Sequence, residues 1–193
     1  MTMFSAMTMT APLFAEPRTR TGSPDPMDEA RFETFYRRHA GSVWSYLFRM
    51  TGNAALADDL LQKAFFRFLR ANPVLESEDH MRRWIFRTAT NLALDHFRET
   101  KRDRTRNEAG PRTESVTTEA RDALRHDMMK TFAELKPRER ALLWLAHVEE
   151  ADHEDIGEAL GVKAKSVKVL LFRARKRLGE LLTKKGLAPE VRR

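Results

Sequence analysis

Hydrophobic residues recur three and four positions apart along most of the chain, which is typical of amphipathic α-helices. Little of the sequence shows the strict alternation expected of half-buried strands. Between Asp28 and about Arg98 the spacing predicts three helices. The first of them carries an apolar stripe that consists of Phe32, Phe35, Tyr36, Val43, Trp44, Leu47 and Phe48.

The second and third predicted helices follow clear breaks in the pattern. A turn at Gly52 and Asn53 precedes the second helix, and "ANPVLESEDH", with Pro73 and several acids, precedes the third. The third helix lies in "MRRWIFRTATNLALDHFRE", residues 81–99. Three such helices can bury one small core. The apolar positions of the second are Leu56, Leu60, Leu61, Ala64, Phe65, Phe68 and Leu69.

A polar stretch divides the chain at residues 100–118. "TKRDRTRNEAGPRTESVTT" has almost no apolar residue, and its charge, Ser/Thr content and Gly110-Pro111 pair favour a linker. After it, Pro137 suits the first turn of a helix, and Asp152 can cap a short one, with Asp155 at a capping-box position. Gly161 fits the next turn. One helix is predicted between the linker and Pro137 from Ala120, Ala123, Leu124, Met128 and Leu135.

These elements predict an all-α protein of two small helical domains joined by a flexible linker, the second with a helix-turn-helix. The expected organisation is a disordered tail at 1–27, domains at 28–100 and 119–186 around a linker at 101–118, and a tail at 187–193. Met27, directly before the first periodic segment, is an alternative start of translation.

Composition narrows the class of protein. The 193 residues are 41% hydrophobic and 33% charged, and the net charge of +7 with a pI near 10.0 favours a polyanionic partner. The absence of cysteine excludes disulfides and thiolate zinc sites within the chain. No apolar run approaches the ~18 residues of a membrane span, and the N-terminus is a poor signal peptide. We therefore expect a cytoplasmic protein without a membrane partner.

The last predicted helix carries apolar residues on two faces. One is an ordinary core stripe from Val167 to Leu178, and it completes a helix-turn-helix pattern with Ile156, Leu160 and Gly161. The second helix of such a motif reads base edges in a major groove. Its cations can contact phosphates or base acceptors, and its apolar residues thymine methyls. The alternative is a solvated basic face with Phe172 packed on a neighbouring helix. This outer face consists of Lys165, Lys168, Val169, Phe172, Arg173 and Lys176.

One side of the third predicted helix combines an aromatic ring, an amide and arginines, and includes Trp84, Arg87, Thr88 and Asn91. Such a face suits unpaired bases, which offer π-faces and Watson–Crick edges. The alternative is that Trp84 is simply a core residue at the start of the helix.

Enzymatic and metal-binding functions find little support in the sequence. The phosphate-binding loop G-x-x-x-x-G-K-[ST] is absent, and no Ser/His/Asp arrangement is identifiable. "HVEEADHED" crowds His147 and His153 with carboxylates, but we expect this acidic cluster to face solvent or a protein partner. No cofactor or metal is expected. None of the histidines has a recognised ligand spacing; they are His39, His80, His96, His126, His147 and His153.

Three ordered segments resemble the sigma-70 family of bacterial transcription initiation factors, specifically the small extracytoplasmic-function group. They are "ADDLLQKAFFRFLR", "WIFRTATNLALDHFR" and "HEDIGEALGVKAKSVKVLLFRARKRL", and the likeness spans about Asp28 to Leu182. The resemblance implies that 28–100 is sigma region 2 and 119–186 sigma region 4. It implies a non-catalytic subunit that directs core RNA polymerase to promoters, and an anti-sigma factor as a further partner.

The resemblance also implies roles for particular residues. The core polymerase clamp helices would contact Asp58, Asp59, Gln62, Lys63 and Phe66; Lys63 stands where the family usually has Glu. The −10 element would be bound by Trp84, Arg87, Thr88 and Asn91. The −35 element would be read by Lys165, Ser166, Lys168, Val169, Phe172, Arg173 and Lys176, with Val169 in place of a commonly polar residue. A DNA-binding regulator that acts without polymerase is the alternative reading of the same helix-turn-helix.

Overall fold

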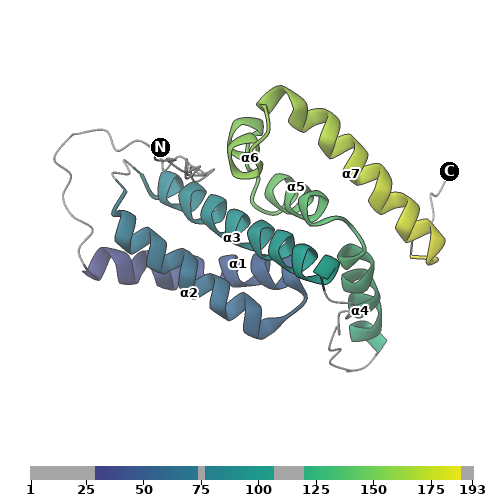
Figure 1. Ribbon diagram of the computed structural model, residues 1–193, viewed down its shortest axis with the longest axis horizontal. Coiled ribbons are helices and arrows are strands. Elements are labelled where there is room, and N and C mark those ends of the chain that lie inside the picture. The colour runs from purple at the N-terminus through teal and green to yellow at the C-terminus, as the bar shows by residue number, and fades with distance from the viewer. Residues whose placement is uncertain (1–28, 74–76, 107–119, 188–193) are drawn as a thin grey trace, which may run out of the picture.

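The protein is described by a computed structural model over residues 29–73, 77–106 and 120–187. These ranges contain seven α-helices and no strand, which confirms the all-α prediction (Figure 1). The helices are α1 (Glu29–Thr51), α2 (Ala54–Ala71), α3 (Glu78–Arg106), α4 (Ala120–Ala133), α5 (Pro137–His147), α6 (His153–Leu160) and α7 (Ala164–Lys184). The predicted tails and most of the predicted linker lie outside the described residues.

Helices α1, α2 and α3 enclose the predicted N-terminal core. Tyr46, Phe68 and Ile85 supply one large side chain each from these helices, and all three are fully buried. The Tyr46 hydroxyl lies 2.7 Å from the Thr90 hydroxyl, which donates to the Phe86 carbonyl at 2.7 Å. The buried Tyr46 therefore keeps a polar partner inside the core.

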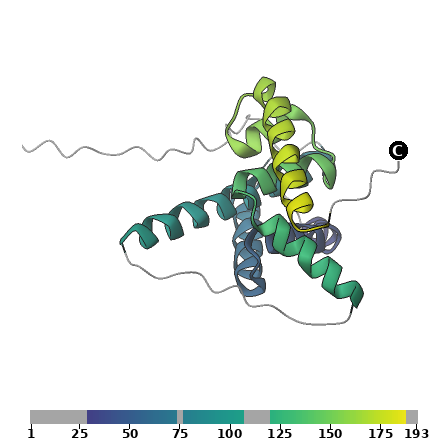
Figure 2. The same cartoon turned by 90° about the vertical axis from the view of Figure 1, so that its right-hand side faces the viewer.

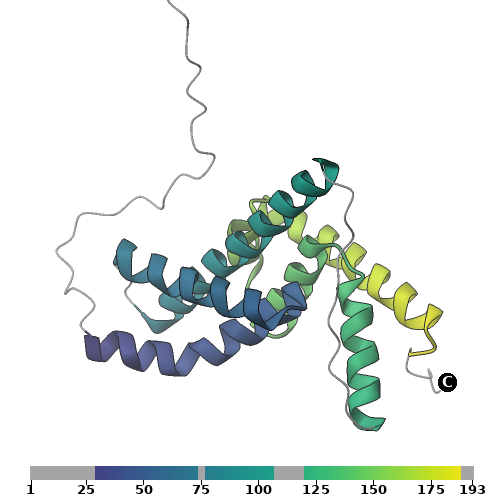
Figure 3. The same cartoon turned by 60° about the horizontal axis from the view of Figure 1, so that its bottom comes forward.

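Helix α3 is longer than the sequence pattern predicts. It was expected to end at Glu99 but continues to Arg106. The residues in between are polar but include no Gly or Pro, so they can extend a helix without an apolar face to bury. The last turns of α3 project beyond the other helices (Figures 2 and 3).

The predicted boundaries of the helix-turn-helix are confirmed. Pro137 begins α5, and the Asp152 side chain caps α6 by accepting from the backbone N–H groups of Glu154 and Asp155 at 2.9 and 2.8 Å. Gly161 ends α6 with a φ of 63°, which only glycine adopts without strain. Asp155 does not complete a capping box, because its carboxylate pairs instead with Arg83 of α3 at 3.3 Å.

Helix α4 packs against α7 and α1 and extends away from the body (Figure 3). Its predicted stripe does not form one buried face. Leu124 and Met128 are exposed, and Leu135 lies beyond the helix end, where it is buried in a small cluster with Ala174 and Leu181 of α7. The period of the apolar residues identified this helix correctly, but not its end.

The two predicted domains pack against each other. Figure 1 shows α3 between α2 on one side and α5 with α6 on the other. Buried side chains of α3, such as Phe86 and Ala93, belong to the same hydrophobic cluster as Leu145 of α5 and Ile156 of α6. The sequence left this arrangement open, since a flexible linker allows both separated and packed domains.

Candidate nucleic-acid interface

The outer face of α7 is open to solvent along its whole length. Val169 and Phe172 are 51% and 66% exposed, so Phe172 does not pack on a neighbouring helix. The opposite stripe holds α7 in place through Val167, Leu171 and Ala174, which are buried. The side chains around the two apolar residues are the exposed Lys165, Lys168, Arg173 and Lys176 and the half-buried Ser166.

A glycine brings α6 and α7 close together. A Cβ on Gly157 would lie 2.8 Å from the Val162 carbonyl oxygen and 3.2 Å from the Ala164 nitrogen. The Gly157 carbonyl in turn accepts from the Val162 N–H at 2.9 Å. Sequence reasoning missed this residue, although a glycine inside a short helical pattern is a signal of close approach.

The predicted base-binding side of α3 is half covered. Trp84, Arg87, Thr88 and Asn91 are all half-buried. The Trp84 ring packs edge-to-face on Phe68 with the centroids 5.2 Å apart, so this ring supports the core as well as lining the surface.

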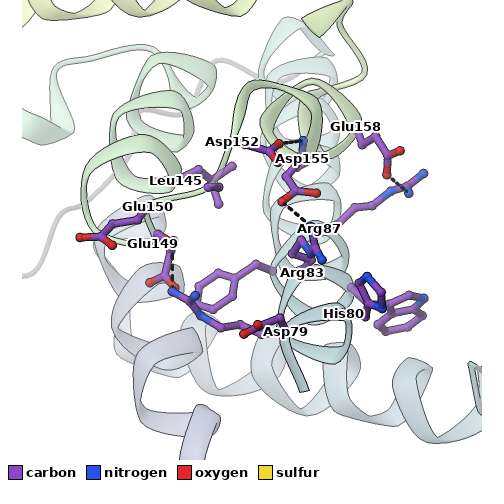
Figure 4. A pocket seen from close by; sticks show the side chains of 15 residues that line it. Asp79, His80, Arg83, Arg87, Leu145, Glu149, Glu150, Asp152, Asp155 and Glu158 are labelled. Carbon is purple, nitrogen blue, oxygen red and sulfur yellow. Dashed lines mark hydrogen bonds and ion pairs between the residues drawn. The ribbon is translucent and has the colours of Figure 1, made fainter. Parts of the chain in front are cut away.

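Arginines of α3 meet carboxylates of the C-terminal domain around a cavity of about 650 Å³ (Figure 4). Arg87 contacts Glu158 at 2.8 Å, and Arg82 contacts the Glu149 carboxylate at 2.7 Å and its carbonyl at 3.1 Å. With the Arg83–Asp155 pair, these contacts form three ion pairs between the domains. The acidic cluster was expected to face solvent or a protein partner. Its Glu149 and Asp155 pair with α3 of the same chain instead, whereas its other carboxylates are exposed to solvent as expected.

Sequence reasoning missed Arg82 and Arg83 as members of this surface. The signal was present as two runs of opposite charge, "MRRW" and "EEADHED". Neither run indicates that the two segments are in contact, because this contact depends on how α6 packs on α3.

Two buried charged side chains lie at the same boundary. Glu149 accepts from Arg82 and from the Trp144 indole N–H at 3.1 Å, so its charge is well partnered. Arg140 is 6% exposed, its guanidinium lies over the Phe97 ring at 5.1 Å, and its Nε has no hydrogen-bond partner. Burial lowers the pKa of Arg140 to about 10, so it stays charged at neutral pH.

A second exposed surface lies on α2. Asp58 accepts from the Trp44 indole N–H at 2.6 Å, and Asp59 pairs with Lys63 at 2.7 Å. Phe66 is 64% exposed beside them, and Gln62 is exposed as well. All five residues predicted to contact core polymerase therefore lie at the surface of one helix.

Metal and membrane binding find no support in residues 29–73, 77–106 and 120–187. These ranges contain no group of three or more His, Asp or Glu side chains placed to hold a metal ion. Within them, too, no helix is both long and apolar enough to cross a membrane.

Comparison with known families identifies the family of the chain. The model of Sigma-70 region 2 matches residues 35–103, and the model of Sigma-70, region 4 matches residues 125–178. The chain belongs to the sigma-70 family. Together the two matches cover more than half of its length.

Named relatives place the chain in the extracytoplasmic-function (ECF) group of this family. The RNA polymerase sigma factor CarQ of Myxococcus xanthus is 29% identical over 168 residues, which are 86% of this chain and 94% of CarQ. The ECF RNA polymerase sigma factor SigE of Mycolicibacterium smegmatis is 31% identical over 164 residues, 79% of this chain but 62% of SigE.

Solved structures share the fold at lower identity. The sigma factor RpoE, in complex with the anti-sigma factor NepR from Bartonella quintana, matches with a TM-score of 0.67 and 19% identity, over 79% of this chain and 96% of RpoE. CnrH, in complex with the cytosolic domain of CnrY, matches with a TM-score of 0.60 and 19% identity, over 81% of this chain and 90% of CnrH.

Proposed function

We propose that this protein is a transcription initiation factor that binds core RNA polymerase, reads −35 and −10 promoter elements and assists promoter melting. Family membership supports this function, and members are non-catalytic specificity subunits. The observation that carries the proposal is that the two matched regions each present an exposed surface of the required chemistry. The outer face of α7 is basic with an apolar centre, and α2 exposes Phe66 among charged side chains.

The −35 element is read by α7 in the major groove. Arg173 and Lys176 reach base acceptors or phosphates, while Val169 and Phe172 contact thymine methyls. Lys165, Ser166 and Lys168 lie at the N-terminal end of the helix, the end that enters the groove first in helix-turn-helix proteins.

The −10 element is bound as a single strand along α3. Asn91, Thr88 and Arg87 offer hydrogen-bonding groups to unstacked bases, and Trp84 offers the exposed part of its ring. Separating about ten base pairs costs on the order of 10 kcal/mol, at about 1.4 kcal/mol per stacking step. Stacking of one base on an aromatic side chain contributes only ~1–3 kcal/mol to binding. Melting therefore depends on core polymerase.

The α2 surface of Asp58, Asp59, Gln62, Lys63 and Phe66 binds the clamp helices of core polymerase. RpoE and CnrH were each solved in complex with a second protein. We infer that an anti-sigma factor binds this chain as well, and that the protein acts in the cytoplasm.

Promoter retention with and without core polymerase tests the proposal. A radiolabelled promoter fragment is expected to be retained by the protein plus core enzyme and poorly by the protein alone. Phe66→Asp is expected to abolish retention by removing core binding, whereas Lys184→Ala, at the exposed end of α7, serves as the control. Retention by the protein alone, unchanged by core enzyme, would identify a stand-alone DNA-binding regulator.

A further inference from the structure

The acidic side of the C-terminal domain pairs with a row of partly exposed arginines on α3. Arg83 and Arg87 are four residues apart and share one face of α3, and Asp155 and Glu158 are three residues apart on one face of α6. The two rows meet in ion pairs of 3.3 and 2.8 Å, and Figure 4 shows both pairs bridging the helices. Arg82 and Glu149 add a third pair beside them.

The same arginines have the chemistry that a DNA strand requires. Arginine binds carboxylate and phosphate oxygens with the same fork of N–H donors. Each carboxylate in this interface therefore pairs with a guanidinium that could otherwise bind a backbone phosphate of the DNA strand. Arg87 belongs to the proposed −10 surface, and Arg83 lies one turn before it on α3.

The arrangement is incompatible with simultaneous binding of both promoter elements. Elements centred at −35 and −10 are separated by about 25 base pairs, which is on the order of 80 Å of duplex at 3.4 Å per base pair. Here α6, which is joined to α7 by a short turn, lies within ion-pair distance of α3. The interface must therefore open before α7 and α3 can each reach their own element.

One residue of the interface opposes its closure. Arg140 is buried between α5 and α3 with an unpartnered Nε, and the ring of Phe97 gives its charge only partial compensation. Separation of the domains would return this guanidinium to water. The ion pairs stabilise the closed arrangement, whereas the buried cation destabilises it. The two effects oppose each other, so the closed arrangement can be opened.

We propose that the closed arrangement is a self-inhibited resting state, in which Glu149, Asp155 and Glu158 occupy the phosphate-binding arginines of α3. This proposal rests on the proposed function for the identity of the displaced ligand, a promoter strand. The closure itself is a property of the free chain. Its test is therefore independent of transcription.

Distance measurement in the free full-length chain tests the closure. The chain has no cysteine, so Arg70→Cys on α2 and Gly179→Cys on α7 introduce two unique sites for spin labels. Both positions are exposed, and a Cβ at Gly179 meets nothing within 4 Å. Electron-spin distance measurements are expected to give one narrow distribution for the otherwise unchanged chain.

Neutralising the carboxylates should open the chain. Asp155→Asn with Glu158→Gln removes two ion pairs that are partly exposed, which is expected to shift the closed-to-open ratio by about 2- to 30-fold and broaden the distances. Glu154→Gln with Glu180→Gln is the matched control. It removes the same charge, including one acid from the first turn of α6, but neither residue bridges to α3.

A variant with the opposite expected effect distinguishes specific opening of the closed arrangement from a general loss of stability. Arg140→Met keeps an unbranched apolar side chain as far as the position of Nε and removes the buried charge, so it is expected to favour the closed state and reduce open complexes formed with core polymerase. The carboxylate variant is expected to increase open complexes several-fold at limiting protein, and the control to leave them unchanged.

Identical distance distributions for the unchanged chain, the carboxylate variant and the control would overturn the proposal, and so would a broad distribution for the unchanged chain. The carboxylate variant could also open while none of the proteins supports transcription. That result would support the self-inhibited closed arrangement and contradict the proposed function.

Discussion

At the scale of single residues, the outer face of α7 offers two kinds of group for the DNA contact that we propose. Val169 and Phe172 form an exposed apolar centre, whose removal from water favours binding only where DNA offers an apolar group such as a thymine methyl. The surrounding cations attract any phosphate backbone regardless of sequence. Arg173 lies next to Phe172, and we propose that it reads a base rather than a phosphate.

Arg173→Ala is expected to weaken binding at particular −35 bases by ~1–3 kcal/mol, because one bidentate guanidinium–guanine contact discriminates by about that much. Holoenzyme affinities for a set of promoters with single −35 substitutions measure the effect. A uniform loss across every substituted promoter would show that Arg173 contacts phosphate.

Asn91→Ala is expected to reduce melting at −10 without reducing core binding, since it removes the amide that we propose to pair with an unstacked base. Permanganate reactivity of −10 thymines in the holoenzyme complex measures this. Asn91 is a cleaner target than Trp84, whose ring also packs on Phe68. Glu99→Ala, exposed further along α3, is the control. Normal −10 reactivity in the Asn91 variant would refute its assignment.

Tyr46→Phe is expected to destabilise the protein by about 1 kcal/mol, the usual net contribution of one hydrogen bond. The loss stays small because the Thr90 hydroxyl keeps its carbonyl partner on Phe86. Burial also raises the pKa of the Tyr46 hydroxyl well above its ordinary value, so it remains protonated and neutral in the folded state. Urea unfolding measures the difference. A loss beyond about 3 kcal/mol would mean that the hydroxyl has a further structural role.

Single side chains were predicted well where periodicity alone decides exposure. The buried and exposed faces of α7 follow from its 3.6-residue period. Trp84 was left between two readings; its ring packs on Phe68 and is half-buried, and its contact with unpaired bases stays a prediction. The acidic cluster was assigned to solvent or a partner protein, which is wrong for Glu149 and Asp155, since their partners on α3 come from a distant part of the chain.

At the scale of elements, the turn between α6 and α7 depends on two glycines for different reasons. Gly161 supplies a left-handed conformation, whereas Gly157 supplies space for the backbone of Val162 and Ala164. The space at Gly157 is bounded by backbone, which cannot rotate away as a long side chain can.

Gly157→Ala is therefore expected to lower stability and displace α7 relative to α6, despite the higher helix propensity of alanine. Gly179→Ala is the matched control, because a Cβ there meets nothing within 4 Å. The control should raise stability by ~0.5–1 kcal/mol. Thermal unfolding of both variants checks the pair. Equal stabilisation by both would contradict the close approach at Gly157.

Element boundaries were predicted where the sequence contains a cap and missed where it does not. Asn53 and Asp152 mark the starts of α2 and α6, and their side chains accept from backbone N–H groups as capping residues do. The end of α3 carries no such signal. Its polar last turns add little to any core, so the apolar pattern stops at Phe97 while the helix continues to Arg106.

At the scale of the whole molecule, the packing of the two domains was not predictable from periodicity. Each domain has an apolar face that could close its own core, and the linker composition allows both open and closed arrangements. The closed arrangement depends on complementary surfaces, with apolar contact between α3 and α6 surrounded by three ion pairs. Partly exposed ion pairs of this kind contribute about 0.2–1 kcal/mol each, which suits an interface that must open.

Run-off transcription tests the central claim most directly. Fragmented genomic DNA is transcribed by bacterial core polymerase with and without this protein, and the products are mapped to their start sites. We predict discrete new transcripts that require the protein and share sequence elements at −35 and −10. Absence of new transcripts, while the protein alone still shifts duplex DNA, would contradict its function as an initiation factor.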